Sequence, residues 1–289
     1  MLEQSPVNRA IVAGVSVGDG LDVAVVGALN VSPESFYAGS VAADADRLLQ
    51  AAEAMARAGA AWLDVGGMST APYLAGRIPE GQEAERLHWA VGLLSTKLDL
   101  PVSADVSRLE PARAALEAGA RMINDVTGLA GDPALARLTA ESGAALVVMA
   151  SPAAAPAIGD PVATVRASLE RSLAVARAAG IPDERVLVDP GIGFFRGAGV
   201  AWPEWDVRVL AGLADLRGLG RPLYVGVSRK AFVGALAGAA DPADRLPGTL
   251  AATAAAITGG AHVIRAHDVA ETVQAVRVAQ AIHRARAGG

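Results

Sequence analysis

Short apolar runs alternate with longer amphipathic stretches along most of the chain. The apolar runs are continuous and lack in-out alternation, which is typical of parallel strands covered on both faces. Strands are expected at 22–28, 61–66, 101–106, 121–126, 144–149, 185–189, 222–227 and 262–266. Helices are expected at 44–58, 81–97, 110–118, 133–142, 161–179, 204–217, near 230–238, at 247–259 and at 269–286. The pattern therefore predicts eight strands, each followed by a helix.

Eight such repeats favour a closed (β/α)8 TIM barrel over an open doubly wound sheet. An additional apolar run at 10–16 precedes the first repeat, and Gly18-Asp19-Gly20 lies between them. This arrangement predicts an N-terminal β-hairpin that pairs 10–16 with 22–28. Because no linker separates the repeats, residues 1–289 are expected to form one domain, with the Pro- and Ala-rich stretch 151–159 as a loop.

Composition narrows the class of protein. The net charge is -5 and the 25 Lys and Arg residues are scattered, so no nucleic-acid partner is expected. Hydrophobic residues make up 52%, yet charge, Gly or Pro interrupts every apolar run before about 18 residues, so no membrane span is expected. The sequence has no Cys, which excludes disulfides and thiolate chemistry, and its first residues lack a secretion signal. These features favour the cytoplasm.

Polar side chains stand where the apolar strands end. The clearest case is the run 186–188, which leads into Asp189 and then a glycine turn at 190–193. Similar positions are held by Asn30, Asp64, Asp105, Asn124, Asp125, Arg265 and His267, with Lys230 shortly after another strand. Because the carboxyl ends of barrel strands meet at one rim, these side chains are expected to form a single site there.

Six motifs follow one another in a recognisable order. They are Gly27-Ala28-Leu29-Asn30-Val31-Ser32-Pro33-Glu34-Ser35-Phe36, Asp64-Val65-Gly66-Gly67-Met68-Ser69-Thr70, Ile123-Asn124-Asp125-Val126, Asp189-Pro190-Gly191-Ile192-Gly193-Phe194, Gly226-Val227-Ser228-Arg229-Lys230 and Arg265-Ala266-His267-Asp268-Val269. In these motifs the chain resembles the dihydropteroate synthase family. That family lies within a wider group of pterin-binding barrels, which also contains methyltetrahydrofolate-dependent methyltransferases.

The resemblance implies a transferase of folate biosynthesis. Its members join 6-hydroxymethyl-7,8-dihydropterin pyrophosphate to an arylamine, conventionally p-aminobenzoate, and release pyrophosphate with the help of Mg²⁺. By this resemblance the catalytic residues would be Lys230, Arg265 and His267, the last two on the pyrophosphate, and the Mg²⁺ ligand would be Asn30. The substrate-binding residues would be Asp105, Asn124, Asp189 and Lys230 for the pterin, with Phe36, Thr70, Phe194 and Ser228 on the arylamine side. Asp64 would also bind substrate, although an acid at such a position could equally be a helix cap or a salt-bridge partner. The family also implies a homodimer, for which the helix at 247–259 is a candidate interface.

The sequence departs from the family pattern at four positions. Ala71 stands where Arg is usual, Ala150 where His is usual, Arg196 where Lys is usual, and Val106 where Thr is usual. Arg77 could supply the charge missing at Ala71. Two alternatives therefore stay open: a synthase that uses a bulkier arylamine in a methanopterin-type pathway, and a catalytically silent pterin-binding paralogue. A methyltransferase is the least favoured.

Other features have simpler interpretations. The glycine turn at 191–196 lacks the third Gly of a dinucleotide-binding loop. His88, His262 and His283 are expected to be structural or solvent-facing, and no zinc site is expected. Trp202 and Trp205 fit either a substrate lid or a subunit contact.

Overall fold

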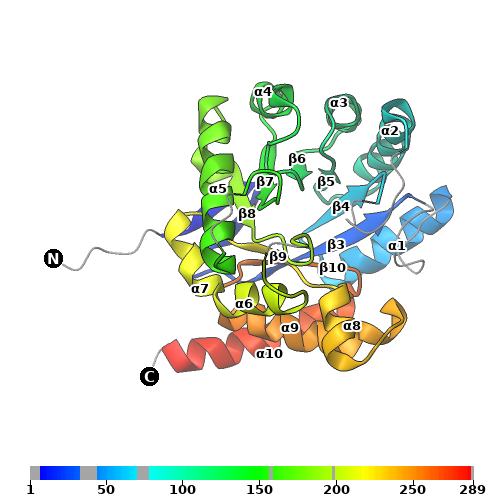
Figure 1. Ribbon diagram of the computed structural model, residues 1–289. Coiled ribbons are helices and arrows are strands. Elements are labelled where there is room, and N and C mark those ends of the chain that lie inside the picture. Colours follow the sequence, from blue (N-terminus) through cyan, green and yellow to red (C-terminus); the bar gives the residue numbers. More distant parts are fainter. Residues whose placement is uncertain (1–6, 33–43, 70–77, 156–158, 197–198, 288–289) are drawn as a thin grey trace.

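Eight parallel strands form the centre of the computed structural model, which describes residues 7–32, 44–69, 78–155, 159–196 and 199–287 (Figure 1). The strands are β3 (Ala24–Asn30), β4 (Trp62–Gly66), β5 (Val102–Asp105), β6 (Met122–Asp125), β7 (Ala145–Met149), β8 (Val186–Asp189), β9 (Tyr224–Gly226) and β10 (Val263–Ala266). They pair in the order β8-β7-β6-β5-β4-β3-β10-β9. A parallel bridge between Val188 and Leu223 joins β8 to the start of β9 and closes the ring. The predicted TIM barrel is confirmed.

Helices surround these strands (Figure 1). They are α1 (Ala45–Ala58), α2 (Glu80–Lys97), α3 (Leu109–Glu117), α4 (Pro133–Ser142), α5 (Pro161–Ala178), α6 (Glu204–Ala211), α7 (Leu213–Leu216), α8 (Ala231–Ala237), α9 (Leu246–Thr258) and α10 (Val269–Ala287). Several begin at an aspartate whose carboxylate accepts a backbone N–H of the first turn, as Asp132 does for α4 and Asp160 for α5. Among the described residues, no helix combines the length and apolarity that crossing a membrane requires.

The helix expected at 204–217 is divided into α6 and α7. The division occurs at Gly212, where a Cβ atom would lie 2.5 Å from Cγ2 of Val162 on α5. Glycine permits this close packing but is a poor residue for a helix interior, so α6 ends there.

Within the described ranges, the buried apolar side chains of the barrel form two regions. The larger one lies between the strands and the helices and includes Leu63, Ile123 and Val225. The smaller one includes side chains from the lower half of the barrel strands, among them Trp62 and Tyr224, whose rings stack with centroids 6.4 Å apart. Two positions further along several of these strands stand polar side chains, as Asp64 after Trp62 and Asn124 after Met122, so this polar layer has an apolar base.

The N-terminal hairpin is present, but its predicted bounds are wrong. It pairs β1 (Arg9–Val12) with β2 (Val15–Gly18), and 24–30 is instead the first barrel strand. The turn is Ala13-Gly14, with φ of 50° and 86°. Two successive positive φ values suit a two-residue hairpin loop, whereas Gly18-Asp19-Gly20 links the hairpin to the barrel. The buried face of the hairpin, which includes Val12 and Val17, belongs to the smaller apolar region.

Asp19 ties the hairpin to the barrel. Its Oδ1 is 3.0 Å from Nε2 of His262 and accepts Nη2 of Arg217 at 2.8 Å, while Oδ2 accepts the backbone N–H of Asn8 at 2.9 Å. The other His262 nitrogen, Nδ1, accepts the N–H of Leu223 at 2.9 Å, so Nε2 carries the proton. His262 is therefore structural, as expected. Burial raises the pKa of Asp19, but the hydrogen bonds from His262, Asn8 and Arg217 outweigh it and bring the pKa to about 2.

We predict that Asp19→Asn lowers the free energy of unfolding at pH 7 by about 1–3 kcal/mol, because charge-assisted hydrogen bonds are lost. The folded-state pKa of Asp19 lies below its usual value, so this stability is present above about pH 4 and is lost as the pH falls through about 2. Urea unfolding of both proteins at pH 7 and near pH 2.5 measures the difference. Equal stabilities at pH 7 would contradict the assignment.

Candidate active site

Five polar side chains from five strands meet inside the carboxyl end of the barrel. They are Asp64 on β4, Asp105 on β5, Asn124 on β6, Asp189 on β8 and Arg265 on β10. In the strand register Asp105 lies beside Gly66 on one side and Asn124 on the other. The sequence prediction that these residues share one end of the barrel is thus consistent with the geometry.

Asp64 is the centre of a buried network. It is fully buried, and its Oδ2 accepts Nε of Arg265 at 2.6 Å and Nδ2 of Asn124 at 3.0 Å. Its Oδ1 accepts the hydroxyl of Ser103. Asp64 therefore fixes the orientation of three neighbouring side chains. The sequence analysis missed Ser103, although it precedes Asp105 by two positions and the period of a strand places both on one face.

Arg265 connects Asp64 to Asp105. Its Nη2 donates to Oδ2 of Asp105 at 3.0 Å, so one guanidinium serves two carboxylates. Burial raises the pKa of Asp105 to about 7, with Arg265 opposing and Asp64 adding to the effect. Oδ1 of Asp105 is buried and has no hydrogen-bond partner among the described residues. The site thus offers an acceptor to a ligand N–H group.

A glycine turn after β8 surrounds Lys230. Oδ1 of Asp189 accepts the N–H of Gly191 at 2.7 Å, and Nζ of Lys230 donates to the carbonyl of Ile192. The same Nζ lies 4.9 Å from the ring centroid of Phe194. Gly191 has φ of 71°, and a Cβ there would lie 2.4 Å from the Ala150 carbonyl oxygen. Burial lowers the pKa of Lys230, and Asp189 acts against that change.

Ser228 and His267 meet at the ends of β9 and β10. The Ser228 hydroxyl is 2.9 Å from Nδ1 of His267 and accepts the His267 backbone N–H at 3.2 Å. Burial, followed by the nearby cations Arg265, Arg229 and Lys230, lowers the pKa of His267 to about 3. The imidazole is therefore neutral at physiological pH in this arrangement.

A second ion pair, which the sequence analysis missed, joins the loops that carry these residues. Nε and Nη2 of Arg229 donate to the two Asp268 oxygens at 2.8 and 2.7 Å. Arg229 also has a positive φ of 53°. The sequence did contain a signal for this ion pair, because Arg229 stands between Ser228 and Lys230 and Asp268 follows His267. The pair fixes the two loops relative to each other.

The remaining predicted residues have different outcomes. Phe194 is half-buried beside Lys230, whereas Phe36 and Thr70, together with Ala71 and Arg77, lie outside the described residues. Asp125 accepts the N–H groups of Thr127 and Leu129 and so organises its loop.

The interpretation of Trp205 as a lid or subunit contact is wrong. Its side chain is 2% exposed and stacks on Phe195 with centroids 5.0 Å apart, so it belongs to the core. An aromatic partner inside the core accounts for this burial, which the sequence pattern did not reveal. Trp202 is half-buried, and the Arg196 guanidinium lies 3.8 Å above its ring.

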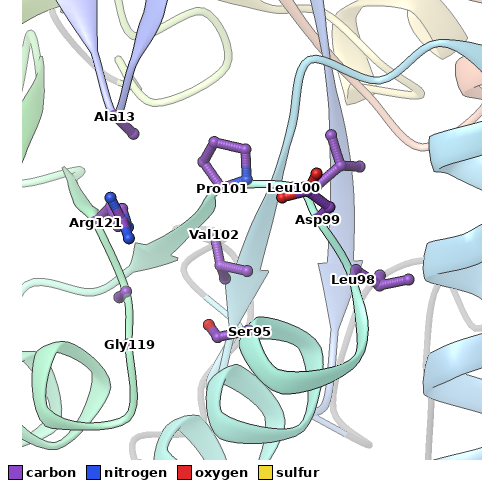
Figure 2. A pocket seen from close by; sticks show the side chains of 10 residues that line it. Ala13, Ser95, Leu98, Asp99, Leu100, Pro101, Val102, Gly119 and Arg121 are labelled. Atoms are coloured by element: carbon purple, nitrogen blue, oxygen red, sulfur yellow. The ribbon is translucent and has the colours of Figure 1, made fainter.

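A groove lies beside the hairpin turn, at the opposite end of the barrel (Figure 2). It is lined by Ala13, Ser95, Asp99 and Arg121 among others, and it includes Val102 at the start of β5. Because the polar network occupies the carboxyl ends of the strands, this groove is separate from the candidate site.

Comparison with known proteins agrees with this geometry. Residues 26–267 match the family model described as pterin binding enzyme. The dihydropteroate synthase of Mycobacterium leprae is 40% identical over 268 residues, which cover 89% of this chain and 92% of the relative.

Solved structures give the same result. The dihydropteroate synthase of Xanthomonas albilineans with 4-aminobenzoic acid aligns with a TM-score of 0.84 at 36% identity, covering 96% of this chain and 98% of the other. The same enzyme in complex with 7,8-dihydropteroate gives a TM-score of 0.79 at 33% identity, covering 95% and 98%. The chain therefore belongs to the dihydropteroate synthase family of pterin-binding enzymes, which are transferases.

Proposed function

We propose that this protein condenses 6-hydroxymethyl-7,8-dihydropterin pyrophosphate with p-aminobenzoate at the carboxyl end of the barrel. The amine nitrogen forms a bond to the pterin methylene carbon. The carbon–oxygen bond to pyrophosphate breaks, its electron pair leaves with pyrophosphate, and the amine proton passes to solvent. The observation that carries this proposal is the buried polar network of Asp64, Asp105, Asn124 and Arg265, with Asp189 and Lys230 close by.

The pterin would bind to the acids, the amide and the lysine at the bottom of this site. An amino-pyrimidine ring presents several N–H donors, and ionised carboxylates only accept hydrogen bonds. Asp105 has an acceptor oxygen available, while Asp189 lies beside Lys230. Asn124 is held in place by its bond to Asp64. Such charge-assisted bonds would fix the methylene carbon in one orientation.

The pyrophosphate would leave past Arg265 and His267. Negative charge grows on the leaving oxygens in the transition state, so donors placed there accelerate the reaction. The hydrogen bonds to Asp64 and Asp105 use two of the five N–H donors of Arg265. His267 is neutral here, and a bound polyanion would favour its protonation.

Mg²⁺ fits the donor set at this edge. A Cβ on Gly66 would lie 3.1 Å from Oδ1 of Asn30, so an amide oxygen of the kind that Mg²⁺ binds lies beside that glycine. The described residues contain no cluster of three acids or histidines that could hold an ion alone. Mg²⁺ in phosphate sites uses one or two protein oxygens together with the phosphates. Asn30 would hold it, and the ion would neutralise charge on pyrophosphate.

The arylamine would lie on the side of Phe194 and Ser228. Ala150, where His is usual in the family, is fully buried in the apolar region between strands and helices.

We further propose that residues 1–289 form a single domain, and that two copies of this chain form a homodimer in the cytoplasm. Support for a subunit contact comes from α10, which packs beside α9 and exposes Val278 and Ile282 by 62% and 51%.

The reaction is tested by measuring pyrophosphate release from the dihydropterin pyrophosphate with p-aminobenzoate. We expect turnover by the wild type and a loss of at least about 100-fold in Lys230→Ala and Asp189→Asn, because each change removes a group that holds the pterin. Pterin binding without release would indicate the silent paralogue. Release only with a bulkier arylamine would indicate the modified-folate pathway.

Pterin affinity should depend on pH through Asp105. Because its pKa is raised to about 7, this carboxyl group is protonated below that pH and ionised above it. An ionised acceptor binds N–H donors better, so affinity should rise about tenfold between pH 6 and pH 8. Calorimetric titration with 6-hydroxymethyl-7,8-dihydropterin measures this dependence. Asp105→Asn should bind more weakly with a flat profile, and an unchanged slope in that variant would contradict the assignment.

A further inference from the structure

Asp206 is a buried carboxylate that neither the sequence motifs nor the proposed reaction uses. It lies on α6, its residue is 0% exposed, and its Oδ1 accepts the backbone N–H of Gly193 at 2.7 Å. A buried charge is costly unless a partner compensates it. An amide at this position would accept the same hydrogen bond without that cost, so the bond to Gly193 alone does not account for a carboxylate.

The partner is found on the other side of the glycine turn. A Cβ on Gly193 would lie 3.2 Å from Cδ and 3.9 Å from Nζ of Lys230, so the backbone of Gly193 is packed directly against this side chain. Nζ of Lys230 also donates to the carbonyl of Ile192, the preceding residue. The backbone of the turn at Gly193 therefore contacts both the carboxylate of Asp206 and the side chain of Lys230.

Two carboxylates hold this turn from opposite ends. Asp189, at the end of β8, accepts the N–H of Gly191, and Asp206, from α6, accepts the N–H of Gly193. The carbonyl of Ile192, which lies between these two glycines, accepts a hydrogen bond from Nζ of Lys230. Movement of the Asp206 anchor would therefore displace the acceptor of the lysine.

We propose that Asp206 is a positioning residue for Lys230, which fixes the glycine turn against the ammonium group and supplies a negative charge behind it. This inference rests on the proposed function, in which Lys230 contacts the pterin. Asp206 itself would touch neither substrate.

The charges around both groups agree with this role. Burial lowers the pKa of Lys230, and the charge of Arg265 also lowers it. The carboxylates of Asp189, Asp206 and Asp105 act in the opposite direction and raise the pKa of the lysine. Asp206 is thus one of three acids that keep the lysine protonated.

The groups around Asp206 favour its ionised form in the same way. Burial raises its pKa, while the Gly193 N–H and the cations Lys230 and Arg196 lower it. The two side chains therefore favour each other's charged forms.

The test is Asp206→Asn in the full chain, followed by the pH profile of kcat/KM for pyrophosphate release. The amide oxygen can still accept the Gly193 N–H, but the charge is gone. The high-pH limb, which reports deprotonation of Lys230 in the free enzyme, should move to lower pH by about one unit. The variant should remain folded, because the amide keeps the Gly193 hydrogen bond and Asp189 and Asp105 still compensate the charge of Lys230.

Two further variants separate positioning from charge. Asp206→Ala removes the acceptor as well and should lower kcat/KM at least about tenfold more than Asp206→Asn at every pH. Asp132→Asn is the matched control, because Asp132 also accepts one backbone N–H, at 2.8 Å from Ala134, but lies at the start of α4. Asn and Asp cap helices about equally well, so the pH profile of Asp132→Asn should match that of the wild type.

An unmoved high-pH limb in Asp206→Asn overturns the proposal, as does failure of that variant to fold, since the role of the carboxylate would then be structural. If the wild type releases no pyrophosphate, the proposed function fails independently. Binding of 6-hydroxymethyl-7,8-dihydropterin across the same pH range then tests Asp206, and a limb that coincides with that of the wild type would again overturn it.

Discussion

The requirement that buried charges be paired determines how the side chains at the carboxyl end of this barrel are arranged. Moving a carboxylate out of water is unfavourable by several kcal/mol unless a cation or several donors replace the water. Arg265 meets this requirement for Asp64 and Asp105 together, and Asn124 and Ser103 complete the shell of Asp64. The side chains are thereby held in one geometry by the protein itself, so a ligand would meet a site whose orientation is already set.

That arrangement depends on what lies beneath it. The lower positions of the same strands carry Trp62, Tyr224 and other apolar side chains, and the hairpin packs below them through Val12 and Val17. Such a base excludes water from one side of the polar layer, which strengthens every electrostatic interaction above it. The pKa of Asp105 shows the result, because burial raises it to about 7 even with Arg265 in contact.

The sequence was sufficient for the barrel because strand and helix periods are local properties. It was also sufficient for the gathering of Asp64, Asp105 and Asn124, since parallel strands end at the same rim. The hairpin register was not accessible, because the choice between turns depended on Ala13 taking a positive φ. The burial of Trp205 and the Arg229–Asp268 pair likewise depend on contacts between elements distant in sequence.

Closure of the ring involves fewer backbone contacts than any other step around it. Neighbouring strands elsewhere pair over three to five positions, whereas β8 and β9 share one bridge, between Val188 and Leu223. Amide hydrogens along this seam consequently have the least ladder protection in the described barrel. Asp189 ends β8 and Lys230 follows β9, so the two residues lie on opposite sides of this seam. Local opening of the seam would therefore change the distance between their side chains.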